Sequence, residues 1–474
     1  MDKSLTEKSL TEKGKNMLAV AVLAAGKGTR MRSSLPKVLQ PLGGKSLVER
    51  VFRATDSLNA DRRIAIVGYC SDQVRASLAN YPNLHPQIEF AEQAEQLGTG
   101  HAIQQLLEPL ADFKGELVVL TGDSPLLRAE TIQNLIDSHC QHKASATVLT
   151  AILADPTGYG RVFCDRDMQI ERIIEHRDCN PEQILNQRVS TGVYCFDWQQ
   201  LAEALPKLTT NNAQKEYYLT EVFDYLSSVY ANDLSDPDES LGINDRLQLA
   251  HAYEILQKRA RDKWMRAGVT MLLPETITID DEVELAPNVT IEPHSHLRGN
   301  TKVGSGTTIG PSSMLTNSII GENCTVQFSV IEDSQIADNC RIGPFARIRG
   351  ESMVGEKCRI GNFVELKNAK VGDRTNAAHL SYLGDATLGE QVNIGAGTIT
   401  ANYDGFKKHQ TVIGDRSKTG SNSVLVAPIQ IGENVNIAAG STIVENVESN
   451  ALAIARAKQI VKPDYYDAEG RKRN

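Results

Sequence analysis

In the first half of the chain, short apolar runs alternate with stretches that have the apolar spacing of a helix. The runs cover residues 18–23, 64–67, 117–120 and 147–152, and residues 130–139 are one of the helix-like stretches. Alternating strands and helices are typical of an α/β domain with a mostly parallel sheet. The pattern therefore predicts such a domain in the first half.

A longer helix is predicted over residues 244–268, with Gly268 as a stop signal. Its apolar side chains recur at helical spacing, namely Leu249, Tyr253, Leu256, Ala260 and Trp264. Composition changes just beyond this helix, because 20 of the 35 Gly follow Leu272 and both Trp precede it. We interpret the helix as a connection between two architectures.

Past Leu273 an apolar residue recurs at every sixth position. Three such ladders cover residues 279–315, 336–366 and 413–443. Hexapeptide repeats of this kind predict a parallel β-helix, a prism with three sheet faces into which each ladder residue points. Cys324, Cys340 and Cys358 each follow a ladder residue by four positions, so we expect them to be small core residues.

The net charge and the length of the apolar runs exclude some classes of protein. The chain has 474 residues and a net charge of −9, which argues against a protein that mainly neutralises nucleic acid or anionic lipid. A small anionic substrate needs only a local basic pocket. No uncharged apolar run approaches the roughly 20 residues of a spanning helix, so we expect no membrane segment.

The cysteines and the first residues bear on the compartment. The eight Cys form no CxxC pair and no Cys/His cluster, which offers no zinc template and favours the reducing cytoplasm. Residues 1–16 carry Lys and precede an apolar run, as in a signal peptide, but they also carry Asp2, Glu7 and Glu12. We expect a disordered leader.

Two motifs in the first half carry chemistry. LAAGKGTRM (23–31) and SLPKVL (34–39) follow a predicted strand, and a glycine turn there brings backbone N–H groups and the cations of Lys27, Arg30 and Lys37 toward phosphates. Met31 occupies the third glycine position of a dinucleotide motif, so that interpretation fails. TGDSPLL (121–127) places Asp123 at the end of another strand, where it could hold Mg²⁺ or only cap a turn.

These motifs belong to a larger set of motifs that follow one another in the order known from one enzyme family. LAAGKGTRM, LPKVL, AEQLGTGHA (94–102), GDSPLL, DPTGYGRV (155–162), IIEH (173–176) and NNAQKEYYLT (211–220), with the hexapeptide half, resemble the bacterial N-acetylglucosamine-1-phosphate uridylyltransferase/glucosamine-1-phosphate acetyltransferases. The resemblance covers about residues 17–458. It implies a Rossmann-like nucleotidyltransferase domain (17–243), a helical linker (244–272), a left-handed β-helix acetyltransferase domain (273–450) and a tail (451–474).

The resemblance also implies the site for UTP and the sugar. The phosphates are assigned to Leu23, Ala24, Ala25, Gly26, Arg30 and Lys37, and the uracil to Gln93, Gly98 and Thr99. The remaining residues of this site are Thr121, Gly122, Asp123, Gly160, Glu175, Ser190 and Asn244, with Asp123 and Asn244 sharing Mg²⁺.

Two positions depart from the family pattern. Ser190 replaces a usual Asn, and Thr121 replaces an aromatic residue. Serine is shorter than asparagine and lacks the amide. The sequence therefore predicts a looser hold on the sugar at position 190, unless water or a neighbour fills the gap.

The hexapeptide half carries a second set of chemical groups. Arg349 and Lys367 each follow a ladder residue and are 18 positions apart, so stacking should bring their backbones to about 4.8 Å. Two cations at that distance repel by roughly 3 kcal/mol, and an anion between them reverses the sign. Arg341 and Arg359 have the same spacing, so the geometry alone barely favours an anion site over a solvated column.

Within the resemblance, His379 corresponds to the base of acetyl transfer, with Glu365 expected to orient it. The acetyl acceptor is assigned to Arg349, Lys367, Tyr382, Asn393 and Lys408. Acetyl-CoA is assigned to Ala396, Asn402, Tyr403, Ser421, Ala439 and Arg456. Residues 400–410 break the period of six and should project as a loop, and the tail from Lys458 should be mobile.

The sequence thus predicts a cytoplasmic homotrimer that makes UDP-N-acetylglucosamine from glucosamine 1-phosphate, acetyl-CoA and UTP, without nucleic-acid or membrane partners. One alternative keeps the nucleotidyltransferase and makes the β-helix a regulatory or assembly module. Another is a non-catalytic scaffold subunit of the same two-domain shape. His379 with Lys367 and Tyr382 argues against the former, and Lys37 with Asp123 against the latter.

Overall fold

The computed structural model describes residues 17–79, 81 and 87–472. The expected leader, residues 1–16, lies outside the described residues. The chain divides into two compact units at Leu256 and Gln257. Among the described residues, none of the helices combines the length and apolarity needed to cross a bilayer.

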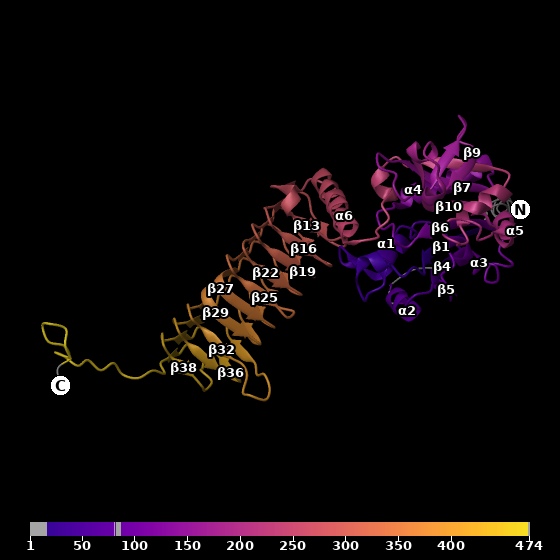
Figure 1. Cartoon of the computed structure of the whole chain (residues 1–474). Coiled ribbons are helices and arrows are strands. Elements are labelled where there is room, and N and C mark those ends of the chain that lie inside the picture. The colour runs from indigo at the N-terminus through magenta and orange to yellow at the C-terminus, as the bar shows by residue number, and fades with distance from the viewer. Residues whose placement is uncertain (1–16, 80, 82–86, 473–474) are drawn as a thin grey trace, which may run out of the picture. The chain divides into compact units, whose positions relative to one another are not determined.

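The first unit is built on one mixed, mostly parallel sheet with the strand order β11-β7-β10-β6-β1-β4-β5 (Figure 1). β10 runs antiparallel to β6 and β7, and the other neighbours in this order are parallel. Its strands are β1 (Met17–Ala24), β4 (Arg62–Val67), β5 (Ile88–Glu92), β6 (Gly115–Thr121), β7 (Ala146–Ile152), β10 (Arg188–Asp197) and β11 (Val229–Asp233), with β8 (Arg161–Cys164) and β9 (Ile170–Ile174) attached. The four predicted strands are confirmed as β1, β4, β6 and β7.

Helices cover both faces of this sheet. Val20 and Val22 of β1 pack in one cluster with α1, α2 and α4, while Ala19 and Ala21 pack in the opposite cluster with α3 and α5. The helices are α1 (Leu47–Arg53), α2 (Ser71–Ala79), α3 (Thr99–Gln104), α4 (Ala129–His142) and α5 (Trp198–Ala204). Burial on both faces explains the continuous apolar runs of the central strands.

The predicted connecting helix is confirmed as α6 (Arg246–Arg266). Within the first unit, Ala252 and Ile255 pack with Leu42 and Ile243. Within the second unit, Trp264 packs on the β-helix core, and Gln257 accepts a hydrogen bond from the backbone N–H of Ile279 at 2.7 Å.

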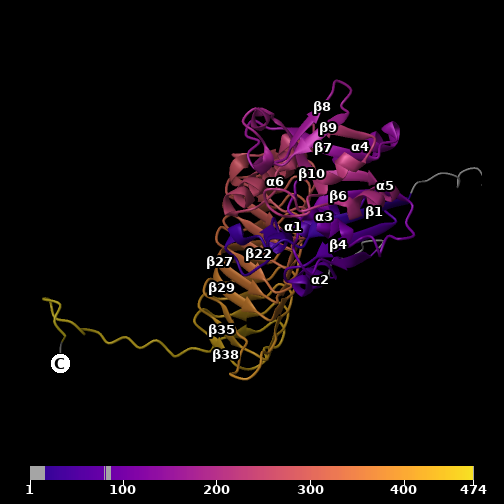
Figure 2. The same ribbon diagram turned by 45° about the vertical axis from the view of Figure 1, so that its right-hand side comes forward.

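The second unit is a left-handed β-helix whose coils stack along its length (Figure 2). The first face contains β12 (Thr270–Met271), β15 (Thr290–Ile291), β18 (Thr308–Ile309), β21 (Thr325–Val326), β24 (Arg341–Ile342), β31 (Asn393–Ile394), β34 (Lys418–Thr419), β37 (Asn436–Ile437) and β39 (Leu452–Ala453). The second contains β13 (Thr278–Ile279), β16 (His296–Arg298), β19 (Met314–Thr316), β22 (Val330–Glu332), β25 (Arg347–Arg349), β32 (Ile399–Ala401), β35 (Val424–Val426) and β38 (Thr442–Ile443). The third contains β14 (Glu284–Leu285), β17 (Lys302–Val303), β20 (Ile319–Ile320), β23 (Gln335–Ile336), β26 (Met353–Val354), β28 (Lys370–Val371), β30 (Ala386–Leu388), β33 (Thr411–Ile413) and β36 (Ile429–Ile431).

Two longer strands, β27 (Arg359–Lys367) and β29 (Asn376–Gly384), continue around the corner between the first and second faces. The predicted apolar ladders are buried in one continuous core. Cys324, Cys340 and Cys358 are buried in the same core, as expected. The predicted interruption after residue 400 is also confirmed, because the chain leaves β32 and rejoins the third face only at β33 (Figure 1).

Candidate active sites

The glycine-rich turn of the first unit brings Lys37 to the carboxyl ends of the strands. β1 ends at Ala24, and Gly28 adopts the left-handed conformation (φ 61°) immediately before a short turn, Thr29–Met31. A Cβ at Gly28 would overlap the Cβ of Lys37. Only glycine therefore meets both demands, the positive φ and the close passage of the lysine.

A cluster of charged and amide groups forms around Lys37. Its ammonium donates to the carboxylate of Asp123 and, at 3.1 Å, to Oδ1 of Asn244, which also accepts from Arg30 at 2.9 Å. The backbone N–H of Ile243 donates to the carbonyl of Asp123 at 2.9 Å, and this bond holds Asn244 beside β6. Four residues distant in the sequence thus meet at one point.

This cluster fits a divalent cation. Asp123 and Asn244 both direct an oxygen at the Lys37 ammonium, which stands in for a metal ion between them. Carboxylate and carboxamide oxygens are the ligand types that hard divalent cations prefer.

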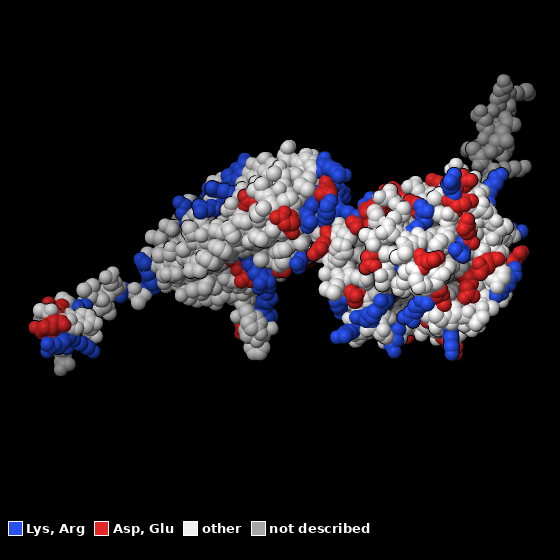
Figure 3. All heavy atoms as spheres, turned by 45° about the horizontal axis from the view of Figure 1, so that its top comes forward, with Lys and Arg blue, Asp and Glu red and all other residues white. Residues whose placement is uncertain are grey.

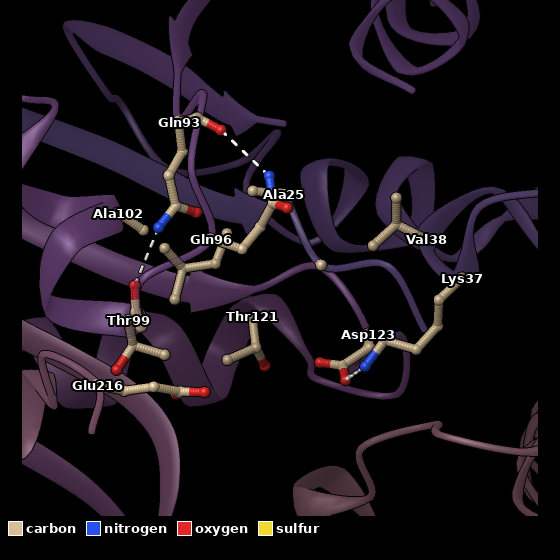
Figure 4. Close-up of a pocket in the computed structure, with 13 residues that line it drawn as sticks. Ala25, Lys37, Val38, Gln93, Gln96, Thr99, Ala102, Thr121, Asp123 and Glu216 are labelled. Carbon is tan, nitrogen blue, oxygen red and sulfur yellow. Dashed lines mark hydrogen bonds and ion pairs between the residues drawn. The ribbon is translucent and has the colours of Figure 1, made fainter. Parts of the chain in front are cut away.

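A cavity of about 310 Å³ opens beside the cluster (Figure 4). Nine predicted residues line it: Leu23, Ala25, Gly26, Lys37, Gln93, Gly98, Thr99, Thr121 and Asp123. Ala24 points into the core and Gly122 donates its N–H to the Leu23 carbonyl at 3.0 Å, so a ligand could reach only their backbone.

The cavity wall opposite Lys37 is a loop held by Gln93. The Gln93 amide donates to the carbonyl of Gly98 at 3.0 Å, and Gly98 has a positive φ of 114° (Figure 4). The backbone N–H of Tyr217 donates to the Leu97 carbonyl at 2.8 Å. The loop therefore depends on the 211–220 segment as well as on its own glycines.

Sequence reasoning missed four lining residues, namely Val38, Gln96, Ala102 and Glu216. All four lie inside the LPKVL, AEQLGTGHA and NNAQKEYYLT motifs. The motifs could have signalled them, but which side chains of a motif face a cavity depends on the fold.

Gly160, Glu175 and Ser190 lie together. The Ser190 N–H donates to the Gly160 carbonyl at 2.9 Å, and a Cβ at Gly160 would lie 3.5 Å from the Glu175 carboxylate. Burial raises the pKa of Glu175, although Thr220 donates a hydrogen bond to it at 2.9 Å. Buried carboxyl groups with a raised pKa are common at sites that bind polar ligands.

At Ser190 a neighbour fills the space that the shorter side chain leaves. The Ser190 hydroxyl lies 3.1 Å from the hydroxyl of Tyr194, which is fully buried. Thr121 lies close to the same segment, because a Cβ at Gly192 would be 3.0 Å from its methyl group. Both departures from the family pattern thus meet at one bulge of β10.

One further group among the described residues has the composition of a metal site: Glu116, His139 and Cys195. Both ring nitrogens of His139 are already engaged, by Glu116 at 2.8 Å and by Thr147 at 3.1 Å. Hydrogen bonding accounts for this buried group without a metal.

In the second unit, His379 begins a column of residues along one corner of the coils. His379 lies on β29 opposite Asn362, and the next coil is attached by the Gly397 N–H, which donates to the Leu380 carbonyl at 2.7 Å. The same corner then carries the predicted acetyl-CoA residues Ala396, Ser421, Ala439 and Arg456. The guanidinium of Arg456 donates to the Ala439 carbonyl at 2.7 Å.

The second face, just past this corner, carries most of the predicted acceptor residues. Arg349 pairs with Lys367 in the register, as the spacing predicts. The Lys367 ammonium lies close enough to Lys408 to lower the pKa of Lys408. Figure 3 shows Lys and Arg side chains gathered in groups on the otherwise largely uncharged surface of this unit.

The structure gives the partners of Glu365 and the place of Asn393. The Glu365 carboxylate is not hydrogen-bonded to His379 in the described part of the chain. It accepts from Arg349 at 2.6 and 2.9 Å, and Glu365 lies opposite Tyr382. Its carboxylate relieves the repulsion expected between Arg349 and Lys367. Asn393 lies on β31 of the first face, opposite Asn376 of β29.

The loop after β32 carries the remaining predicted residues. The Asn402 amide donates to the Asp385 carboxylate at 2.5 Å, and Asp385 donates its N–H to the Lys367 carbonyl at 2.9 Å. Tyr403 and Lys408 pair across the loop in an antiparallel bridge. The exposed tail beyond Lys458 contains the bridge Tyr466–Lys472.

Three family models match parts of the chain. The MobA-like NTP transferase domain matches residues 20–171, the GMPPB C-terminal domain matches 273–374, and the six-repeat bacterial transferase hexapeptide matches 410–445.

Curated relatives match nearly the whole chain. The bifunctional protein GlmU of Acaryochloris marina is 60% identical over 449 residues, 95% of this chain and 98% of that protein. Those of Trichormus variabilis (58% over 454 residues, 96% and 100%) and a Picosynechococcus species (60% over 443 residues, 94% and 98%) are similarly close.

Proposed function

The chain belongs to the GlmU family, so it is both a uridylyltransferase and an acetyltransferase of UDP-N-acetylglucosamine synthesis, and we propose that each activity has its own site in a separate unit. UDP-N-acetylglucosamine is a precursor of peptidoglycan. The nucleotidyltransferase domain comprises residues 17–243, the linker 244–272 and the acetyltransferase domain 273–450. The observation that carries the proposal is the occurrence of two separate constellations, one around Lys37 and one around His379.

We assign uridylyl transfer to the cavity beside Lys37. A phosphate oxygen of N-acetylglucosamine 1-phosphate attacks the α-phosphorus of UTP, and pyrophosphate leaves. Lys37 and Arg30 lower the cost of bringing these anions together, with the N–H groups of the 23–26 segment completing the phosphate site. Gln93, Gly98 and Thr99 hold the uracil, and Gly160, Glu175 and Ser190 border the sugar.

This family requires a divalent metal, and we assign Mg²⁺ to Asp123 and Asn244. When bound, Mg²⁺ supplies positive charge for the phosphate oxygens. Lys37 must release the two oxygens that it now contacts, and the triphosphate offers its ammonium another partner. The residues fit this exchange because both oxygens already converge on one cation.

We assign acetyl transfer to the corner column and the adjoining second face. His379 accepts the proton as the amine of glucosamine 1-phosphate attacks the thioester carbon, and the C–S bond breaks to release coenzyme A. We assign the oxyanion to the backbone N–H of Ala396, which donates to no other residue in the described chain. Arg349, Lys367 and Lys408 bind the sugar phosphate, and Tyr382 and Asn393 bind the sugar.

We further propose that the protein works as a homotrimer in the cytoplasm. The rings of Phe328, Phe345 and Phe363 stack along the outer side of the coils with centroids 5.5 and 5.3 Å apart, and all three are exposed. Such an apolar column is surface that a second copy of the chain would cover.

The test is to assay both half-reactions in variants of the first constellation. Lys37→Ala and Asp123→Ala should abolish uridylyl transfer and leave acetyl transfer nearly intact. Asp123→Asn should also weaken Mn²⁺ binding measured by electron paramagnetic resonance, independently of turnover. Equal loss of both activities in a folded variant would contradict the two-site assignment.

A further inference from the structure

The loop of residues 402–410 brings groups for two different substrates to one place. Asn402 and Tyr403, assigned above to acetyl-CoA, stand on one side of the loop, and Lys408, assigned to the sugar phosphate, stands on the other. The geometry of this loop therefore bears on both substrates of acetyl transfer.

A single carboxylate closes the loop. Asp404 Oδ1 accepts from the backbone N–H groups of Phe406 and Lys407, both at 2.8 Å, and Oδ2 accepts from Nε2 of His409 at 2.6 Å. The Lys407 amide, then the His409 ring and the Phe406 amide hold the pKa of Asp404 well below its usual value. The carboxylate is therefore ionised at neutral pH.

His409 ties the two sides of the loop together twice. Its ring donates to Asp404, and its backbone N–H donates to the Asn402 carbonyl at 2.8 Å. Tyr403 and Lys408 form the antiparallel bridge enclosed by these contacts. The position of Lys408 relative to Tyr403 is thus set in part by Asp404 and His409, neither of which is assigned to a substrate.

Apolar packing does not hold this hairpin. Phe406 at its tip is 95% exposed and Tyr403 is 62% exposed. A two-stranded hairpin without a packed face is marginally stable in water. Its polar contacts must supply the order, and Asp404 with His409 makes the only hydrogen bond between two side chains of this loop in the described chain.

We propose that the Asp404–His409 pair is a latch that holds Tyr403 and Lys408 side by side, so that His409 is a positioning residue for both substrates of acetyl transfer. This rests on the assignment of Tyr403 and Lys408 made above. Without the latch the loop samples many conformations. Part of the binding free energy of each substrate is then used to order the loop, so the apparent affinity for each substrate falls.

The test compares three variants of the full-length protein. His409→Leu removes the donor, and His409→Gln keeps an amide donor near the position of Nε2. His294→Leu, which removes an exposed His elsewhere on the β-helix, is the control. His409→Leu should raise KM for glucosamine 1-phosphate and for acetyl-CoA about tenfold each, the worth of one hydrogen bond to a charged group. kcat should stay within about threefold, and His409→Gln and His294→Leu should match the wild type.

Tryptic cleavage of the folded protein gives a second readout that does not depend on turnover. Lys407 and Lys408 are exposed in the loop, so opening the latch should speed cleavage after them. Mass spectrometry of the fragments should show faster cleavage in His409→Leu and wild-type cleavage in His409→Gln.

The proposal is overturned if His409→Leu leaves both KM values unchanged, or if His409→Gln behaves like His409→Leu. Lys408→Ala and Tyr403→Ala separate the two levels of the argument. If they raise KM and His409→Leu does not, only the latch fails. If they leave KM unchanged as well, the assignment of the loop to substrate binding fails with it.

Discussion

Gly384 offers a sharp perturbation of the acetyl-transfer site. It lies on β29 opposite Lys367, in ordinary strand conformation. A Cβ at this position would overlap the Tyr382 hydroxyl and come within 2.7 Å of the Asn402 amide nitrogen. Gly384→Ala therefore displaces one group assigned to the acceptor and one assigned to acetyl-CoA.

The displaced atoms are the ends of side chains, so they can move without a change in the backbone. The positions of the two assigned groups are lost by that movement. Moving the Asn402 amide breaks its 2.5 Å hydrogen bond to Asp385. A hydrogen bond to a charged group is worth about 1.5–3 kcal/mol, or roughly 10- to 150-fold in an equilibrium constant. We expect KM for acetyl-CoA to rise at least about tenfold, with a loss of Tm no larger than this one hydrogen bond accounts for.

Gly361→Ala is the matched control, because its Cβ would overlap the backbone carbonyl oxygen of Ala378. Backbone cannot move aside as a side chain can, so this variant should lose stability, at about 2–4 °C of Tm per kcal/mol. Steady-state kinetics of both half-reactions measure the change in KM, and calorimetry measures the change in Tm. A Gly384→Ala protein with wild-type acetyl transfer, or with reduced uridylyl transfer, would refute the reasoning.

Three further variants test single residues. His379→Ala should lower kcat of acetyl transfer about 10²- to 10⁴-fold with little change in KM, and turnover within a few-fold of wild type would place the base elsewhere. Ser190→Asn should lower KM for N-acetylglucosamine 1-phosphate about fivefold only when combined with Tyr194→Phe, which removes the hydroxyl now bonded to Ser190; a gain in the single variant would contradict this. Burial raises the pKa of Glu175, so the folded state loses stability as pH rises from the ordinary Glu pKa, about 4.3, to the raised pKa of the folded protein. Glu175→Gln should therefore raise Tm at pH 8, and in calorimetry the gain should shrink toward about pH 4. A pH-independent Tm difference would count against this reasoning.

Periodicity foretells the fold well where burial repeats along the chain. The ladder from Ile279 to Leu315 alternates inward residues with solvent-facing ones, and the structure buries each ladder position. The stacking of Arg349 on Lys367 follows from the same repeat. A rule of spacing suffices here because each coil contacts only its neighbours.

Periodicity does not predict which partner a polar side chain pairs with. The 18-residue spacing stacks Glu365 on Arg347, but it does not show that the Glu365 carboxylate pairs with the guanidinium of Arg349. The Ser190–Tyr194 bond depends on a bulge in β10, which shifts the register of its pairing with β7. The convergence of Lys37, Asp123 and Asn244 depends on packing between distant segments, and only the family resemblance pointed to Asn244.

The two-site account is tested most directly by complementation between two inactive proteins. Neither Lys37→Ala nor His379→Ala should make UDP-N-acetylglucosamine from glucosamine 1-phosphate, acetyl-CoA and UTP alone, and Lys37→Ala should accumulate N-acetylglucosamine 1-phosphate. Mixing them should restore the product, because the acetylated intermediate passes through solution from one protein to the other. A mixture that stays inactive while both proteins are folded would contradict separate, independent sites.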